Sequence, residues 1–340
     1  RALLWGAVAS LVIANTINAG TDIGAISAAI NMFVPIPIKA MIIPIAALIL
    51  ALQIWGSYRF IAKTFKWLTL ALFAYIGAAF FAKPDWPQVL RATFVPSFSF
   101  NAGFLSTLVA ILGTTISPYL FFWQASQEVE EEVSMGRRHL ADRKGATDAE
   151  LKYAAWDVNA GMFISNLVMY FIILATATTL FRAGKTDIQS ATDAAEALRP
   201  LAGDGARALL GIGLIGSGLL AVPVLTGCSA YALAEALGWK LGLDRKPKFA
   251  KGFYGIIIGG TLIGMLVNFC GINPIKALFW TAVVNGLLAP PLLMILMLIS
   301  NNRAVMGDRR NGGVANTLGW LTTAVMFAAA IGLILTWNQI

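Results

Sequence analysis

The stretch Gly113-Thr114-Thr115-Ile116-Ser117-Pro118-Tyr119 lies in the middle of an apolar run that covers about residues 104–125. Pro118 cannot donate to a helical hydrogen-bond ladder, and glycine, threonine and serine are weak helix formers. We therefore expect a membrane helix that breaks here and frees backbone carbonyls, which are tolerated at that depth only where protein or water meets them. Two interpretations remain open: an ion site of the kind that broken transporter helices form, or a proline kink whose freed groups bond to Ser and Thr hydroxyls.

The rest of the chain consists of similar apolar runs. Of its 340 residues, 58% are hydrophobic and 12% are charged, whereas soluble chains carry about 25% charged residues. A run of about 20 apolar residues crosses the roughly 30 Å core of a bilayer. We predict an all-α polytopic membrane protein with one transmembrane domain over residues 1–340 and about nine spans, near residues 3–30, 38–57, 64–82, 104–125, 155–181, 208–237, 250–270, 274–299 and 315–337.

The net charge of +8 comes from basic residues that lie between the apolar runs. We read them as topology signals, because Lys and Arg concentrate in cytoplasmic loops, and expect no nucleic-acid partner. One set of alternate loops, including residues 127–154 and 301–312, holds 17 of the 25 Lys and Arg residues and is expected to be cytoplasmic. Within these loops Thr147 to Glu150 predicts a capping box, and residues 190–196 on the opposite side predict a short helix.

Asp22 is the only acidic residue deep in an apolar run, and ionisable groups inside membrane helices are functional candidates by default. Asn15, Asn18 and Asp22 follow the spacing i, i+3, i+7 and share one helical face. We expect this polar stripe to face the bundle interior or a water path. The alternative is that Asp22 lies near the outer end of its helix, where bulk water reaches it.

Two mid-span amides, Asn268 and Asn285, are either ligands or interhelical hydrogen-bond partners. Asn285 precedes Pro290-Pro291, which should kink or break its helix, and Gln124 is expected near the cytoplasmic exit. Cys228 and Cys270 are expected to be buried free thiols, and the lone His139 makes a zinc-type site improbable.

Two features favour plain structural interpretations. The G-x-G-x-x-G of residues 211–216 follows no strand and predicts close helix packing rather than nucleotide binding. The acidic run of residues 128–132 is typical of a solvated face. No nucleophile–base pair, paired carboxylates or phosphate loop appears, so we expect neither an enzyme nor a bound cofactor.

Residues 113–127, Gly-Thr-Thr-Ile-Ser-Pro-Tyr-Leu-Phe-Phe-Trp-Gln-Ala-Ser-Gln, resemble the sixth helix of NRAMP divalent-metal transporters. The similarity is greatest to the NRAMP-related branch associated with magnesium. The order of spans resembles family helices three to eleven, which implies a LeuT-type inverted-repeat fold. It also implies that the first two helices, with a metal-binding Asp, lie upstream of Arg1. The remainder of the first repeat would cover residues 1–100, the second repeat 101–300, and an extra helix 301–340.

The resemblance implies roles for individual residues. The family's alanine, which offers a carbonyl to the metal, corresponds to Thr114, its methionine ligand to Ser117, and its histidine to Tyr119. The acid of the proton or water path corresponds to Asp22, while a second expected acid is Ala25 here. A polar position on the tenth family helix falls near residues 282–285. Oxygen ligands in place of a thioether favour magnesium, calcium or manganese over softer metals.

These observations predict a secondary transporter of divalent cations, Mg²⁺ or Mn²⁺, in a bacterial plasma membrane, with the lipid bilayer and the metal as partners and protons as a candidate coupling ion. The expected metal residues are Thr114, Ser117 and Asn285. The expected proton or water path contains Asp22, Asn18, Tyr119 and Gln124. The alternatives are an amino-acid permease of the same fold class and a membrane scaffold that transports nothing.

Overall fold

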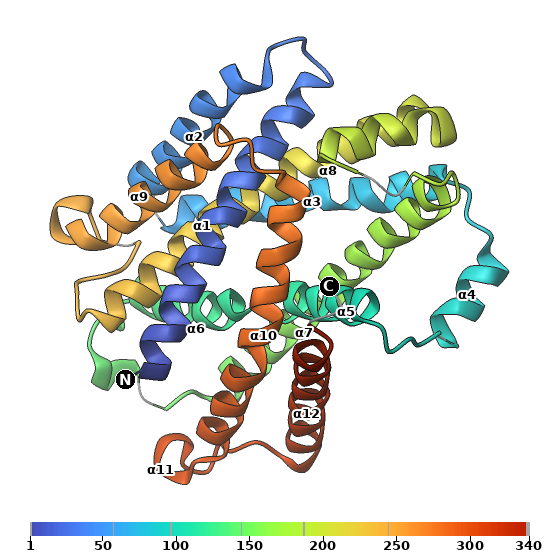
Figure 1. The fold of residues 1–340 in the computed structure, drawn as a ribbon. Helices are drawn as coiled ribbons and strands as arrows, with labels where there is room; N and C mark the ends of the chain where they lie inside the picture. Colours follow the sequence, from blue (N-terminus) through green and yellow to red (C-terminus); the bar gives the residue numbers. More distant parts are fainter. Residues whose placement is uncertain are drawn as a thin grey trace.

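The computed structural model describes residues 2–56, 58–95, 97–143, 145–185, 188–243 and 245–337 of the chain, and the regular elements in these ranges are helices (Figure 1). The long helices are α1 (Ala2–Asn31), α2 (Ile38–Trp55), α3 (Tyr58–Phe81), α5 (Ala102–Thr115), α6 (Pro118–Ser134), α7 (Asp148–Thr176), α8 (Ala191–Ala236), α9 (Lys251–Val267), α10 (Pro274–Asn301) and α12 (Gly313–Leu335). Shorter elements are α4 (Trp86–Phe94), α11 (Arg303–Met306), the π-helical turn η2 (Ala177–Phe181), and the 3₁₀ turns η1 (Leu140–Arg143) and η3 (Pro247–Phe249).

Each of the nine expected spans coincides with a helix, or with the pair α5 and α6. Among the described residues, six helices are long and apolar enough to cross a membrane, or seven if a bent pair is counted as one span. That pair is the end of α3 together with α4, between which the chain bends by 116°, and α4 itself was not expected from the sequence. α10 continues through Pro290 and Pro291, so of the expected kink or break the break is wrong, and the kink stays a prediction. The proposed repeat boundaries also stay a prediction.

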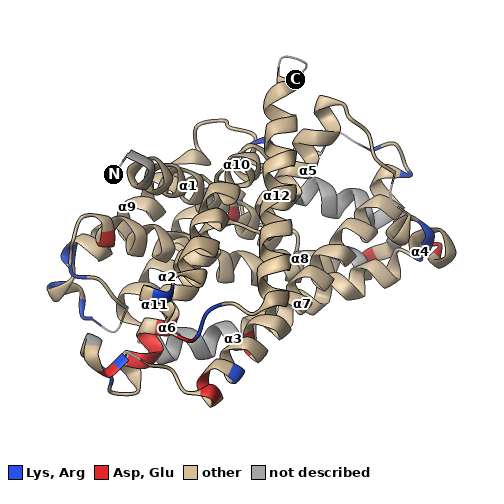
Figure 2. Cartoon of the chain, turned by 90° about the horizontal axis from the view of Figure 1, so that it is seen from below, with Lys and Arg blue, Asp and Glu red and all other residues tan. Residues whose placement is uncertain are grey.

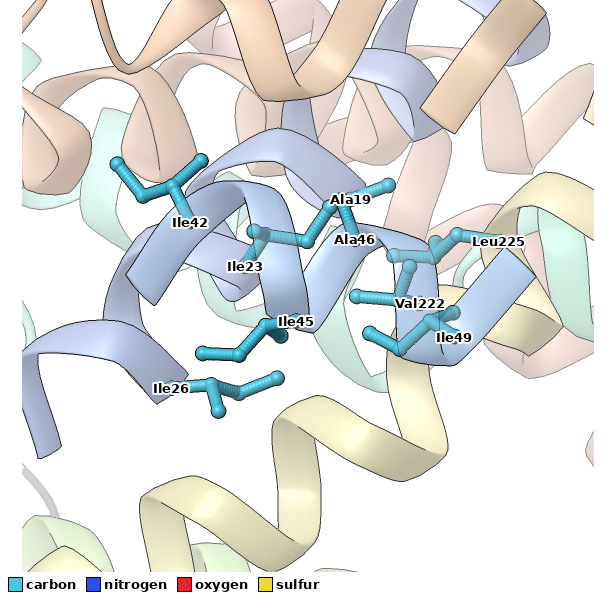
Figure 3. Close-up of a cluster of buried hydrophobic side chains, with 9 residues drawn as sticks. All are labelled: Ala19, Ile23, Ile26, Ile42, Ile45, Ala46, Ile49, Val222 and Leu225. Atoms are coloured by element: carbon cyan, nitrogen blue, oxygen red, sulfur yellow. The ribbon is translucent and has the colours of Figure 1, made fainter. Parts of the chain in front are cut away.

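The α1, α2, α8 and α9 helices pack together as a scaffold. Figure 3 shows its apolar centre, to which α1, α2 and α8 contribute Ala19, Ile23, Ile26, Ile42, Ile45, Ala46, Ile49, Val222 and Leu225. At the crossing of α1 and α9, a Cβ on Gly20 would lie under 3.0 Å from backbone atoms of Gly264. Asn268 Nδ2 donates to the carbonyl of Gly20 at 2.8 Å, so this amide is an interhelical hydrogen-bond partner. Small residues thus set the spacing of these helices, as is common in membranes.

The glycines of the G-x-G-x-x-G stretch also serve packing, as expected. A Cβ on Gly213 would lie 2.7 Å from the ring of Tyr75 on α3, and one on Gly216 would collide with Ala71. Tyr75 Oη and Ser217 Oγ are 3.0 Å apart and add a polar bond to the same interface. The helix predicted at residues 190–196 forms the start of α8, which is bent at Gly203, where φ is 85°.

Contacts between loops join members of the same predicted set. On the side expected to be cytoplasmic, Arg309 pairs with Asp148. On the other side, Arg182 donates to Gln88, Asn273 donates to Gln189, and Arg207 donates to the carbonyl of Met32. Figure 2 shows charged residues around α6 and α11 and near α4, with few along the helices between them. The alternation of sides predicted from the apolar runs therefore agrees with the structure.

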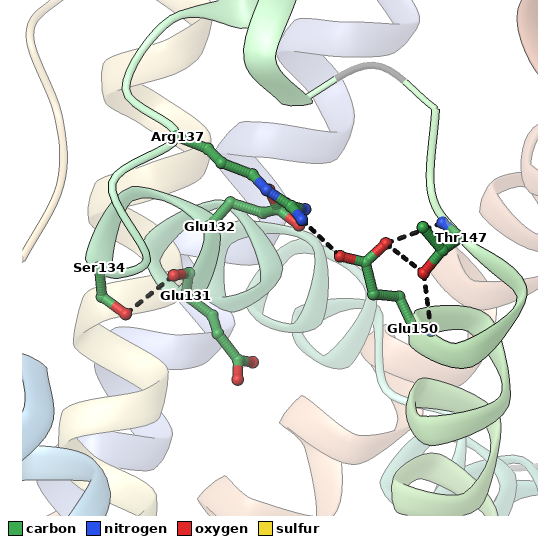
Figure 4. Close-up of polar contacts among 6 residues, drawn as sticks. All are labelled: Glu131, Glu132, Ser134, Arg137, Thr147 and Glu150. Atoms are coloured by element: carbon green, nitrogen blue, oxygen red, sulfur yellow. Dashed lines mark hydrogen bonds and ion pairs between the residues drawn. The ribbon is translucent and has the colours of Figure 1, made fainter.

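The capping box at the start of α7 is confirmed, and it joins an ion network with the end of α6 (Figure 4). Thr147 N donates to Glu150 Oε2 at 2.7 Å, and Glu150 N donates to Thr147 Oγ1 at 3.3 Å. Arg137 binds Glu132 at 2.9 Å and Glu150 at 2.6 Å. One guanidinium therefore ties α6 to α7 across the loop between them.

Replacing Arg137 by alanine should weaken this tie without unfolding the protein. Exposed ion pairs contribute little to stability and are screened by salt. We expect a small decrease in the thermal unfolding midpoint at low salt, and nearly none at high salt, measured on purified protein in detergent. A large decrease that persists at high salt would show that the network matters by packing rather than by charge.

Candidate functional site

The helix break predicted from Pro118 is confirmed. α5 ends at Thr115, α6 begins at Pro118, and the two residues between them have non-helical backbone: Ile116 at φ −118°, ψ 57° and Ser117 at φ −74°, ψ 136°. Asn101 caps the start of α5 by accepting from Phe104 N at 2.8 Å. The break therefore separates two regular half-helices.

The hydroxyl groups at the break satisfy part of the freed backbone. Ser117 Oγ donates to the carbonyl of Gly113 and lies 3.3 Å from that of Thr114. Thr114 Oγ1 donates one turn back to Ala110 at 2.9 Å. Since Pro118 has no N–H, the Thr114 carbonyl lacks its helical donor. Ser117 is buried, with 2% of its surface exposed, whereas Thr114 is exposed.

The break is held against α10 by a backbone-to-backbone crossing. A Cβ on Gly113 would lie under 3.0 Å from Ala282 and Gly286, and a Cβ on Gly286 would lie equally close to the Val109 carbonyl. Asn285, next to this crossing, is 2% exposed, and its Oδ1 has no hydrogen-bond partner in the described part of the chain. Buried polar atoms are nearly always bonded, so this oxygen is suited to a ligand.

The polar stripe on α1 faces the region between α8 and α10, and its members have different partners. Asn15 is fully buried and donates to the Leu225 carbonyl and to Ser229 Oγ, both at 3.2 Å. Asn18 Oδ1 instead accepts from Thr281 Oγ1 on α10. Asn15 therefore ties α1 to α8 through its amide nitrogen, although its Oδ1 has no hydrogen-bond partner among the described residues. Asn18 is the member of the stripe that bonds to α10.

Thr281 was not identified from the sequence. Its position four residues before Asn285, and so on the same face of α10, is a signal that could have found it.

Asp22 is partly buried, and within the described ranges its carboxylate forms no hydrogen bond or ion pair. Tyr119 packs against the apolar cluster that contains Ala19 and Ile23, the α1 residues on either side of Asp22 in sequence. Tyr119 follows Pro118 at the start of α6, and its carbonyl accepts from the thiol of Cys228 at 3.4 Å. The fold thus packs the first turn of α6 against the part of α1 that carries Asp22, about ninety residues away in sequence.

Gln124 lies further along α6, is exposed, and donates to Glu128 at 2.9 Å. Cys228 is buried and free, but Cys270 is exposed beyond the last turn of α9, so its expected burial is wrong.

Among the described residues no three His, Cys, Asp or Glu side chains gather into a metal-binding group. A cation at the break would therefore meet hydroxyl, amide and carbonyl oxygens.

These features define a polytopic α-helical membrane protein with a broken helix packed against its scaffold. The chain belongs to the Nramp family, because the family model, described as natural resistance-associated macrophage protein-like, matches residues 1–336.

Curated relatives include two bacterial proteins named divalent metal cation transporter MntH. That of Bacillus subtilis is 26% identical over 292 residues, which are 84% of this chain and 63% of the relative. That of Caldanaerobacter subterraneus is 26% identical over 264 residues, 77% of this chain and 58% of the relative. The chain therefore spans about three fifths of the length of these relatives.

Solved structures of an Eremococcus coleocola manganese transporter share the fold. The match to a mutant of that transporter covers 96% of this chain and 73% of the mutant's chain, with a TM-score of 0.59 and 17% identity. The match to the same transporter in complex with an aromatic bis-isothiourea substituted compound covers 99% of this chain and 74% of the transporter's chain. Its TM-score is 0.59 and its identity 19%. The expected all-α transporter fold is confirmed.

Proposed function

We propose that the protein carries divalent metal cations, Mg²⁺ or Mn²⁺, across a bacterial plasma membrane by secondary transport, with its cargo site at the break between α5 and α6. The observation that carries this proposal is the buried, unpartnered Oδ1 of Asn285 beside the crossing that holds the break. Membership of the Nramp family and relatives named as divalent metal cation transporters support it.

The chain would contribute oxygen ligands to the cargo. Thr114 offers a carbonyl without its helical donor, Ser117 a hydroxyl, and Asn285 an amide oxygen. Such ligands suit hard cations, and Mg²⁺ retains several of its waters when it binds proteins. Asp22, Asn18, Tyr119 and Gln124 would line the path that water or protons follow to and from this site.

Calorimetric titration of the purified full-length protein that contains this chain tests the proposal, with Mg²⁺, Mn²⁺ and Ca²⁺ as probes. We expect saturable binding of Mg²⁺ and Mn²⁺ that weakens on the order of tenfold to a hundredfold in Asn285→Leu and in Ser117→Ala, the range seen when groups around a metal are removed.

Two matched controls make the same substitutions at positions away from the proposed site. Asn166→Leu removes an exposed amide on α7 that bonds within its own helix, and Ser126→Ala removes a hydroxyl on α6 that does the same. Both should bind metal as the wild type does. Unchanged binding in Asn285→Leu and Ser117→Ala would overturn the placement of the site. Absence of divalent-ion binding in folded protein would favour the amino-acid permease or the scaffold, and the same titration with amino acids as probes would separate these two.

A further inference from the structure

Glu130 is the buried member of an acidic run that was expected to be solvated. Its neighbours Glu128 and Glu131 on α6 are exposed, whereas Glu130 is only 4% exposed. The expectation of a solvated face is therefore wrong for this one residue. Burial of a carboxylate is costly unless hydrogen bonds compensate for the lost water.

The compensating bonds come from the scaffold. Glu130 Oε1 accepts from Tyr231 Oη at 2.6 Å, near the end of α8, and from Leu243 N at 2.7 Å, in the loop before α9. Gly242 shapes this loop: its φ is +125°, and a Cβ there would lie 2.9 Å from Glu130 Oε1. The loop is thus folded around the carboxylate, and glycine is needed for both conformation and space.

Aromatic packing continues the same attachment toward the break. Trp123, two turns before Glu130, lies edge-on to Tyr231 with ring centroids 6.2 Å apart, and Tyr231 lies 4.8 Å from Phe253 on α9. A Cβ on Gly227 would lie 2.7 Å from the Trp123 ring. At the start of α6, the Cys228 thiol donates to the carbonyl of Tyr119. The α6 half-helix therefore lies along α8 from its first turn to Glu130.

The other half-helix has a different attachment. α5 crosses α10 in backbone contact at Gly113 and Gly286, and Val109 packs with Val283 and with Leu333 of α12. The non-helical residues Ile116 and Ser117 thus join one half-helix that belongs to α10 and α12 with another that belongs to α8 and α9.

We propose that Glu130 is a positioning residue that clamps the α6 half-helix to the α8–α9 loop, so that movement at the break leaves Pro118 and Tyr119 fixed on α8. The clamp rests on the proposed function only in its consequence for transport. The attachment itself is a property of the fold and can be tested without any cargo.

Cys228 provides a native reporter, because it is fully buried beneath the first turn of α6. Cys270 is exposed just beyond the end of α9 and provides an internal reference. The experiment measures maleimide labelling rates of both cysteine-containing peptides by mass spectrometry, in full-length protein reconstituted in liposomes. Because labelling requires no metal, failure of the proposed transport would leave this test intact.

In Glu130→Ala we expect Cys228 to label about tenfold faster or more, with the Cys270 rate unchanged, since the substitution removes the acceptor of the buried Tyr231 hydroxyl and a tenfold shift corresponds to about 1.4 kcal/mol. Tyr231→Phe should give a smaller increase, because Leu243 N still binds the carboxylate. Glu130→Gln, which keeps an acceptor oxygen, should restore most of the protection. The matched control Glu131→Gln, which changes the same charge one residue away, should label as the wild type does.

A wild-type Cys228 rate in both Glu130→Ala and Tyr231→Phe would overturn the clamp. Faster labelling of Cys228 and Cys270 together in Tyr231→Phe would also overturn it, because it would show general loosening instead of release of α6. Should Glu130→Ala fail to fold, Tyr231→Phe and Glu130→Gln decide the matter. Where transport is measurable, Glu130→Ala should change the flux while Glu131→Gln does not.

Discussion

Gly286→Ala should abolish folded, transport-competent protein. A Cβ at this position would lie 2.7 Å from Val109 Cγ1 and closer still to the Val109 carbonyl. A carbonyl in a helix cannot turn aside as a flexible side chain can, so α5 and α10 would have to separate. Overpacking of this kind costs about 1–3 kcal/mol, and more where backbone must move. Because the crossing also holds the break, a protein that survives would have a displaced site.

The measurement is the thermal midpoint and the size-exclusion profile of Gly286→Ala and of Gly113→Ala, which adds the reciprocal methyl group. Gly259→Ala in α9 is the control for a helix glycine, since nothing lies within 4 Å of its added Cβ. It should be as stable as the wild type or more so, given the higher helix propensity of alanine. Wild-type midpoints for both crossing variants would show that α5 and α10 are not in backbone contact.

The second large effect is expected at Asp22, and it should appear in transport rather than in stability. The carboxylate forms no hydrogen bond or ion pair with the described residues, so Asp22→Asn removes no bond that the fold depends on. An ionisable group in a membrane helix is costly and is retained for function. We therefore expect metal influx into liposomes to fall to the level of protein-free liposomes, with an unchanged or slightly higher thermal midpoint.

Asp157→Asn on the exposed face of α7 is the matched control, and it should transport normally. If Asp22→Asn lowered the thermal midpoint and the flux in proportion, Asp22 would be a structural residue. Normal flux would exclude Asp22 from the path altogether.

The sequence by itself determined the long helices and the break between α5 and α6. In a bilayer each backbone group must find its partner within its own helix or protein surroundings, so long apolar runs specify helices locally. Pro118 specifies the interruption through the N–H that it lacks. The capping box from Thr147 to Glu150 is equally local, since its partners are three residues apart.

Hydropathy alone could not indicate which residues meet. The proline pair at 290–291 did not interrupt α10. Helical spacing could have pointed to Thr281, but not to its partner Asn18, which is 263 residues away in the chain.

Glu130 and its exposed neighbours have the same local chemistry, yet one is buried because Tyr231 and the loop at Gly242 and Leu243 enclose it. The glycine crossings at Gly20 with Gly264 and at Gly113 with Gly286 likewise depend on which faces pack together. Short-range physics therefore determined the elements of this protein. The tertiary structure decided the partners, because close packing and the burial of a polar group depend on residues far apart in the chain.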